Sequence, residues 1–182
     1  DINHGPLECL FTVDEETGLT GAFGLDPSML KSRILLNLDS EDDGEFFIGC
    51  AGGKDTVIEL PIENEIIPGG YKIFKIKVSG LQGGHSGDDI HRNRGNANKI
   101  LNRFLWECAR DFGARVCTFE GGNLRNAIAR EANSIFIVPE DKSREIMSVA
   151  ERYLKAIRFE FRVSEPDLAI DLEVNVACNS VL

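Results

Sequence analysis

The sequence has no long hydrophobic run and no excess of positive charge. It contains no stretch of about 18 consecutive apolar residues, so we expect no membrane-spanning helix. It carries 20 Lys and Arg residues against 30 Asp and Glu residues, which is a formal net charge of −10. A surface with this balance repels phosphate backbones and anionic lipids. This argues against nucleic acid or a membrane as a partner.

The sequence also lacks cysteine pairs with a regular spacing. Its five cysteines are scattered, and none forms a Cys-x-x-Cys motif: Cys9, Cys50, Cys108, Cys117 and Cys178. An odd, scattered set favours buried, reduced thiols over zinc ligands or disulfides. No signal peptide is visible, and we predict a cytoplasmic protein. The 182 residues suffice for one domain, or for one domain and a piece of another.

Two short apolar runs each end in acidic residues. Residues 7–13 are apolar and β-prone, and three carboxylates follow them directly, Glu15 and Glu16 among them. Residues 34–38 form a second run of the same kind, which ends at Asp39. Short apolar runs of this length are typical of buried strands. The sequence therefore predicts two strands with acidic carboxyl ends.

Residues 19–33 are long enough for a crossover helix between these strands, which would make the strands parallel. Parallel strands end at the same edge of a sheet, where open α/β sheets bind ligands. Glu15, Glu16 and Asp39 would then share one cation, and their oxygens suit zinc, manganese or magnesium alike. A solvated acidic turn is the alternative interpretation. A calcium-binding EF-hand is excluded, because Cys50 stands where that loop requires a bidentate Glu.

The remaining chain alternates strand and helix patterns. A third short strand is predicted at 45–50, and the small residues 51–53 are expected to form a hinge. Beyond the hinge we predict strands at 55–62, 71–78, 114–120, 132–138 and 168–176, and helices at 95–112 and 142–158. This order is typical of a ferredoxin-like α+β fold, an antiparallel sheet with two helices on one face.

Local signals refine the predicted elements. The strands 55–62 and 71–78 are expected to pair as a hairpin. Gly113 is expected to end the first helix in the left-handed conformation. Asp141 or Ser143 is expected to cap the second helix.

A glycine-rich loop at 80–87 contains His85. Glycines allow a backbone to approach a ligand closely, or they simply permit a tight turn. His85 is therefore either a ligand-facing residue or a structural loop histidine. A serine-hydrolase elbow is excluded, because Asp88 replaces its last glycine and no strand-to-helix turn follows Ser86.

Three segments, taken in this order, resemble the M20 family of dinuclear zinc peptidases. They are Val-Asp-Glu-Glu-Thr-Gly at 13–18, Leu-Asn-Leu-Asp-Ser-Glu at 36–41 and Gly-Gly-His-Ser-Gly at 83–87. The resemblance implies that residues 1–53 belong to the α/β catalytic domain of a zinc peptidase. It implies that residues 54–182 form a lid and dimerisation domain. The implied activity is hydrolysis of dipeptides, Xaa-His dipeptides among them, by a metal-activated water.

The same resemblance implies roles for individual residues. Glu15 matches the general base, and Glu16 and Asp39 match ligands of the two zinc ions, for which Mn²⁺ or Co²⁺ can substitute. His85 matches a lid histidine that stabilises the oxyanion of a substrate held by the other subunit, which implies a homodimer. Asn126 matches an asparagine near the substrate.

Two arginines accompany Asn126. Arg125 and Arg130 have the planar fork that matches the two oxygens of a carboxylate, and they could bind that of a dipeptide. The alternative is a polar loop that lines a dimer interface. Ala129 stands where the family often has proline, which loosens the backbone of this loop.

Parts of the family pattern are missing, which are a His-x-Asp motif and a bridging Asp upstream and a final His downstream. The family requires a His-x-Asp motif upstream of Glu15, whereas the only histidines here are His4, His85 and His91. We therefore expect a fragment that is inactive by itself. The alternative function is a non-catalytic dimerisation or lid module.

Overall fold

The computed structural model describes residues 2–39, 43–50, 52, 54 and 56–182. The chain forms two units, Asp1–Thr56 and Val57–Leu182. The expected boundary between residues 53 and 54, and the identity given to each side of it, remain predictions. Within the described part, no helix has the length and apolar character needed to cross a membrane.

The described residues of the first unit form only short helical turns. These are α1 (Glu15–Gly18), α2 (Thr20–Phe23) and the 3₁₀ turn η1 (Pro27–Met29). Asp14 and Leu19 adopt left-handed conformations with φ of 60° and 58°, so the chain changes direction before α1 and again before α2. The single crossover helix expected between residues 19 and 33 is therefore not formed.

The predicted strands at 7–13, 34–38 and 45–50 are wrong for this chain. The structure assigns no strand to the described residues of the first unit. Apolar side chains in these runs, such as those of Phe11 and Ile48, are exposed. A parallel strand persists only when neighbours bond its backbone and other layers cover both faces. A β-prone composition therefore shows that a segment can form a strand where neighbouring strands and covering layers exist, but it does not supply them.

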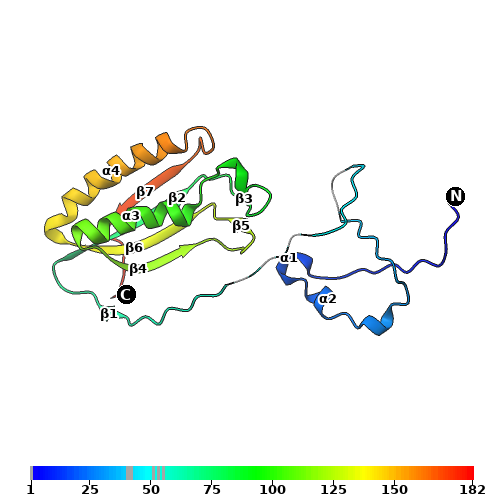
Figure 1. Ribbon diagram of the computed structural model, residues 1–182. Helices are drawn as coiled ribbons and strands as arrows, with labels where there is room; N and C mark the ends of the chain where they lie inside the picture. Colours follow the sequence, from blue (N-terminus) through cyan, green and yellow to red (C-terminus); the bar gives the residue numbers. More distant parts are fainter. Residues whose placement is uncertain (1, 40–42, 51, 53, 55) are drawn as a thin grey trace. The chain divides into compact units, whose positions relative to one another are not determined.

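The second unit is built on a four-stranded antiparallel sheet, which confirms the predicted mixed fold of helices and sheet (Figure 1). The strands lie in the order β4-β6-β2-β7. Along the chain the main elements are β2 (Tyr71–Ser79), α3 (Ala97–Phe112), β4 (Arg115–Gly121), β6 (Ala132–Pro139), α4 (Ser143–Glu160) and β7 (Ala169–Val174). This β-α-β-β-α-β order, with β6 between β2 and β4, is the ferredoxin-like arrangement that the sequence predicts.

Both helices pack against the same face of the sheet (Figure 1). The core between these layers contains three fully buried aromatic rings. The rings of Phe74 and Phe136, on neighbouring strands, are stacked with centroids 5.5 Å apart. Phe104 of α3 meets Phe136 edge-on at 5.9 Å. Strand residues on this face alternate with residues on the opposite face, as the pleat requires.

The helix ends follow local chemistry only in part. Gly113 ends α3 with φ of 66°, as predicted. At its start, the Asn96 side chain caps the helix by accepting a backbone N–H of the first turn. The expected cap of α4 by Asp141 or Ser143 is wrong, because no side chain caps this helix. The chain enters α4 from the 3₁₀ turn η3 (Glu140–Lys142), which already has near-helical geometry.

The strand predicted at 55–62, and its hairpin with 71–78, are also wrong. The described residues from 56 to 62 form no strand, and β2 pairs instead with β6 and β7. A two-residue strand, β1 (Glu65–Ile66), pairs with β8 (Ser180–Val181) near the end of the chain. Val181 packs with Cys117 and Ile137 in a second, smaller apolar cluster.

Candidate functional site

The glycine-rich segment and the Asn126 loop lie side by side. Strand β3 (Gly84–His85) pairs antiparallel with β5 (Ala127–Ile128), and His85 is opposite Ala127. The Ser86 backbone N–H also donates to the Asn126 carbonyl oxygen at 2.8 Å. The structure therefore brings together two segments that the sequence separately predicts to be functional.

The His85 ring has a defined hydrogen-bonding pattern. Its Nδ1 atom accepts the backbone N–H of Gly87 at 3.1 Å and that of Asp88 at 3.2 Å. Because both partners are donors, Nδ1 acts as the acceptor, and in a neutral imidazole the ring proton is then on Nε2. The side chain is about half exposed, at 51%. His85 is thus oriented to offer an N–H donor from Nε2.

Asp89 links the backbone of His85 to two arginines. The His85 backbone N–H donates to Asp89 Oδ2 at 2.9 Å. Arg94 Nη1 lies 3.1 Å from the same oxygen, and Arg92 Nε lies 3.1 Å from Oδ1. The pKa of the Asp89 carboxyl is lowered, mainly by the His85 hydrogen bond and further by Arg94 and Arg92. Arg94 also donates to the Gly83 carbonyl oxygen at 2.5 Å, so it holds the glycine-rich segment at a second point.

Gly83 and Gly84 are required by this packing. Their φ values are 69° and 136°, which side chains with a Cβ rarely adopt. A Cβ on Gly84 would collide with the guanidinium of Arg94, and one on Gly83 would collide with the Arg130 side chain. Arg130 crosses Gly83 and donates from Nε to the Leu81 carbonyl oxygen at 3.3 Å. The glycines therefore allow both arginines to lie against the backbone next to His85.

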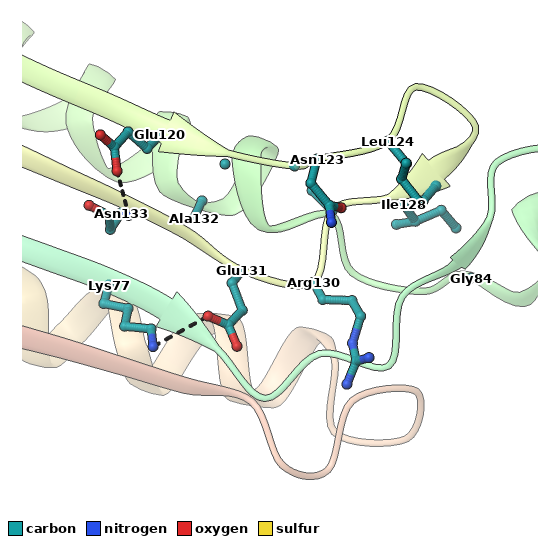
Figure 2. Close-up of a pocket in the computed structure, with 14 residues that line it drawn as sticks. Lys77, Gly84, Glu120, Asn123, Leu124, Ile128, Arg130, Glu131, Ala132 and Asn133 are labelled. Carbon is teal, nitrogen blue, oxygen red and sulfur yellow. Dashed lines mark hydrogen bonds and ion pairs between the residues drawn. The ribbon is translucent and has the colours of Figure 1, made fainter. Parts of the chain in front are cut away.

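A depression of about 680 Å³ borders this segment (Figure 2). The residues lining it include Lys77, Gly84, Glu120, Asn123, Arg130 and Asn133. Two of its lining residues, Lys77 and Glu131, form an ion pair of 3.3 Å. A smaller depression of about 300 Å³ is lined by Arg125 together with Asn96 and Asn98. Amides and charges of both signs suit a small polar molecule that itself carries both charges.

The acidic residues of the first unit do not form a comparable site. Glu15 and Glu16 belong to α1, and the Asp39 backbone N–H donates to the Asn37 side chain at 3.1 Å. Among the residues that the structure describes, no three His, Cys, Asp or Glu side chains are grouped so as to hold a metal ion. The structure therefore does not unite Glu15, Glu16 and Asp39, and their roles remain predictions.

Sequence reasoning missed three residues that support His85. Asp89 and Arg94 follow closely after the glycine-rich segment, so a search for charges near the loop could have found them. Glu165 bonds to the backbone of Gln82, 83 positions earlier in the chain. No local pattern connects residues so far apart, and only the fold reveals this contact.

Comparison with known proteins places these features in a family. Residues 69–162 match the family described as the M20 peptidase dimerisation domain. The chain is 44% identical over 173 residues to cytosol non-specific dipeptidase of Escherichia coli K12, and it covers 36% of that protein. The crystal structure of aminoacylhistidine dipeptidase from Vibrio alginolyticus matches with a TM-score of 0.72 and 37% identity.

That structural match covers 93% of this chain and 35% of the Vibrio chain. The alignment with the Escherichia coli protein includes 95% of this chain. The chain thus spans little more than a third of the length of either relative. Because the family match covers residues 69–162, which is more than half of the 182 residues, the chain belongs to the M20 peptidase dimerisation-domain family.

Proposed function

We propose that this chain is part of a metal-dependent dipeptidase, in which residues 57–182 act as the lid and dimerisation module. Its proposed substrates are dipeptides, Xaa-His dipeptides among them. The similarity to two dipeptidases supports the reaction class. The word cytosol in the name of one relative supports a cytoplasmic location.

The observation that carries the proposal is the pair of hydrogen bonds to His85 Nδ1. They leave Nε2 as the donor, and a neutral imidazole N–H can bond to a carbonyl oxygen. In peptide hydrolysis this oxygen gains negative charge as the carbonyl carbon becomes tetrahedral. A donor that is already oriented stabilises the developing charge without reorganising. His85 would perform this role for a substrate bound by the partner subunit.

The neighbouring loop would bind the rest of the dipeptide. Asn126 is fixed beside His85 through its carbonyl oxygen, which accepts the Ser86 N–H. Arg130 lines the larger depression and Arg125 the smaller one. In the proposal one of these guanidinium groups pairs with the substrate carboxylate, because the fork accepts both oxygens.

The proposed metal centre needs more ligands than the described residues bring together. Carboxylates of the kind carried by Glu16 and Asp39 are suitable ligands, but the described residues do not group as a site. The described residues alone therefore do not fit a dinuclear centre. In the proposal Glu16 and Asp39 supply ligands for two Zn²⁺ ions, with Mn²⁺ or Co²⁺ as substitutes, and segments outside this chain complete the set. Glu15 would take a proton from the attacking water.

Two experiments test this proposal. Dipeptide hydrolysis should be absent for the 182-residue chain and present for a protein extended to the length of the relatives. In the extended protein, His85→Ala should lower kcat by about 100-fold or more, since a single oxyanion donor contributes this much. The control His91→Ala removes a nearby histidine outside the proposed machinery and should keep normal turnover. Equal activity of His85→Ala and wild type would refute the role of His85.

The second candidate function is a dimerisation module without a catalytic role. It is favoured by the family match, because that family is described as a dimerisation domain. Light scattering after size exclusion should find the isolated chain as a homodimer of two 20.1 kDa copies. A monomer at micromolar concentration would count against both functions, whereas a dimer in an inactive extended protein would favour the second.

A further inference from the structure

A buried carboxylate holds both ends of the segment that carries His85. Glu165 lies in the turn between α4 and β7, and the residue is only 2% exposed. Its Oε2 accepts the backbone N–H of Gln82 at 2.8 Å, and its Oε1 accepts the backbone N–H of Gly95 at 2.7 Å. Gln82 precedes His85 and Gly95 follows it. The Glu165 side chain thus links the two ends of the loop between Gln82 and Gly95.

The turn that contains Glu165 contacts residues 80–82, at the start of this loop, in two further ways. The Gln82 side-chain amide donates to the Ser164 carbonyl oxygen at 2.9 Å. The Asp167 carbonyl lies so close to Gly80 that no Cβ would fit there. Gly80 also has φ of 76°, which favours glycine. The turn therefore fixes residues 80–82, from which the His85 segment begins.

A carboxylate suits this position better than an amide. Both oxygens of Glu165 accept a hydrogen bond, and bonds from backbone N–H groups to a charged acceptor are stronger than neutral ones. Gly95 lies just before the Asn96 cap of α3, and the amino end of a helix favours negative charge. These interactions offset the cost of burying the carboxylate. A glutamine would present an NH₂ group to one of the two N–H donors.

We propose that Glu165 is a positioning residue that sets the place of His85 by holding Gln82 and Gly95 together. This inference rests on the proposed role of His85 in the reaction. Glu165 itself does not touch the substrate in this proposal. It acts through the backbone, which continues from Gln82 into β3 and so into the pairing with β5.

The first test uses the 182-residue chain and does not depend on activity. Glu165→Gln should raise the amide hydrogen exchange of Gln82 or Gly95 by about 10-fold or more, because one bond is lost. Exchange at Ser86, which bonds to Asn126, should rise with it. Asp167→Asn makes the same chemical change at an exposed position of the same turn and should leave all three amides unchanged. Unaltered exchange in Glu165→Gln would overturn the inference.

The second test uses the extended enzyme and a double-mutant cycle. Glu165→Gln should lower kcat by about 10-fold to 100-fold with little change in KM, because the donor is misplaced while substrate still binds. In a His85→Ala background the same substitution should have almost no effect, since the two residues act as one unit. Additive losses in the double variant would mean that Glu165 does not act through His85.

The two tests separate the inference from the proposed function. Suppose that Glu165→Gln raises the exchange of the Gln82 or Gly95 amide while His85→Ala leaves turnover normal. The clamp, meaning the two hydrogen bonds from these amides to Glu165, then exists, and the catalytic role of His85 is refuted. If Glu165→Gln does not fold, scalar couplings across hydrogen bonds decide the matter in the wild-type chain. Couplings from the Gln82 and Gly95 amides to the Glu165 carboxyl carbon would support the clamp. Their absence at both amides would overturn it.

Discussion

The Ser86 backbone N–H donates a hydrogen bond of 2.8 Å to the carbonyl oxygen of Asn126. This bond continues the pairing of β3 with β5 and holds the His85 segment against the Asn126 loop. Neither segment has long regular structure of its own, so each depends on the other for its position. Changes that loosen one segment are therefore expected to displace the other.

Replacing Gly84 by alanine should disrupt the site locally. The new Cβ would collide with Arg94 and Asp89, and φ at this position is +136°. We expect a loss of about 1–3 kcal/mol in the free energy of unfolding, measured by urea denaturation. Gly69→Ala is the matched control, because no atom lies within 4 Å of its added Cβ. Equal stabilities of the two variants would contradict the packing described for Gly84.

Acid should release the contact between His85 and Asp89. The pKa of Asp89 is below its ordinary value of 3.8, mainly because the carboxylate accepts the His85 backbone N–H. A depressed carboxyl pKa stabilises the fold fully above the unfolded value, and this stabilisation disappears as the pH falls through the folded value. The His85 amide resonance, followed by NMR, should therefore titrate below pH 3.8.

The Asp89→Asn variant should abolish that titration of the His85 amide. The variant keeps a side-chain oxygen but loses the charge that pairs with Arg92 and Arg94. Asp141→Asn, an exposed position in η3, should leave the acid titration as in wild type. An identical titration in wild type and Asp89→Asn would assign it to another group.

Truncating the aromatic core should destabilise the second unit strongly. Phe136 is fully buried and contacts the rings of both Phe74 and Phe104. Phe136→Ala should cost about 3–5 kcal/mol, because it removes buried surface and leaves a cavity. Phe159→Ala, at a position that is 68% exposed near the end of α4, should change stability by only about 0.5 kcal/mol. Thermal unfolding followed by circular dichroism measures both changes.

The cysteines should divide into reactive and unreactive groups. Burial raises the pKa of Cys108 to about 12, and burial together with the nearby Cys178 thiol raises that of Cys117 to about 12. Because only the thiolate reacts, iodoacetamide at pH 8 should leave both unmodified in the native chain. Cys9 and Cys50 are exposed and should be alkylated. Mass spectrometry of peptides reads the result, and alkylation of Cys108 as fast as Cys9 would contradict it.

The same thiols predict that the fold weakens in alkali. A raised pKa leaves stability intact below the ordinary value of 9.0 and removes it as the pH rises toward about 12. The Tyr153 pKa, raised to about 12 by burial, contributes in the same direction. The urea midpoint should therefore fall steadily above pH 9. Cys108→Ala should reduce this fall, whereas a midpoint independent of pH would refute the explanation.

The second unit was largely predictable from the sequence. Alternation in residues 71–78 and the helical spacing in 95–112 both indicate one buried face, and the structure has β2 and α3 there. These patterns are reliable because the apolar face of each element packs against other elements of the same unit. The strand predicted at 55–62 is wrong, since the composition resembles a strand but no strand pairs with the described residues 56–62.

The first unit shows the limit of the same reasoning. Residues 7–13 and 34–38 have the composition of buried parallel strands, yet the described residues around them supply neither paired strands nor covering layers. The carboxylate of Glu8 instead accepts the backbone N–H groups of Lys31 and Ser32, at 3.0 and 2.6 Å. A side chain, not a strand ladder, connects the first run to the segment just before the second.

The sequence by itself determined which residues became candidates for a site: the acidic pair Glu15 and Glu16, the glycines around His85, and, through the family resemblance, Asn126. It did so through residue type and local order, which do not depend on how the chain folds. Only the tertiary structure decided that the His85 segment lies beside Asn126 and that Glu165 links Gln82 to Gly95, on either side of His85. Such contacts depend on how distant segments pack, because a hydrogen bond requires atoms about 3 Å apart and sequence spacing sets no such distance.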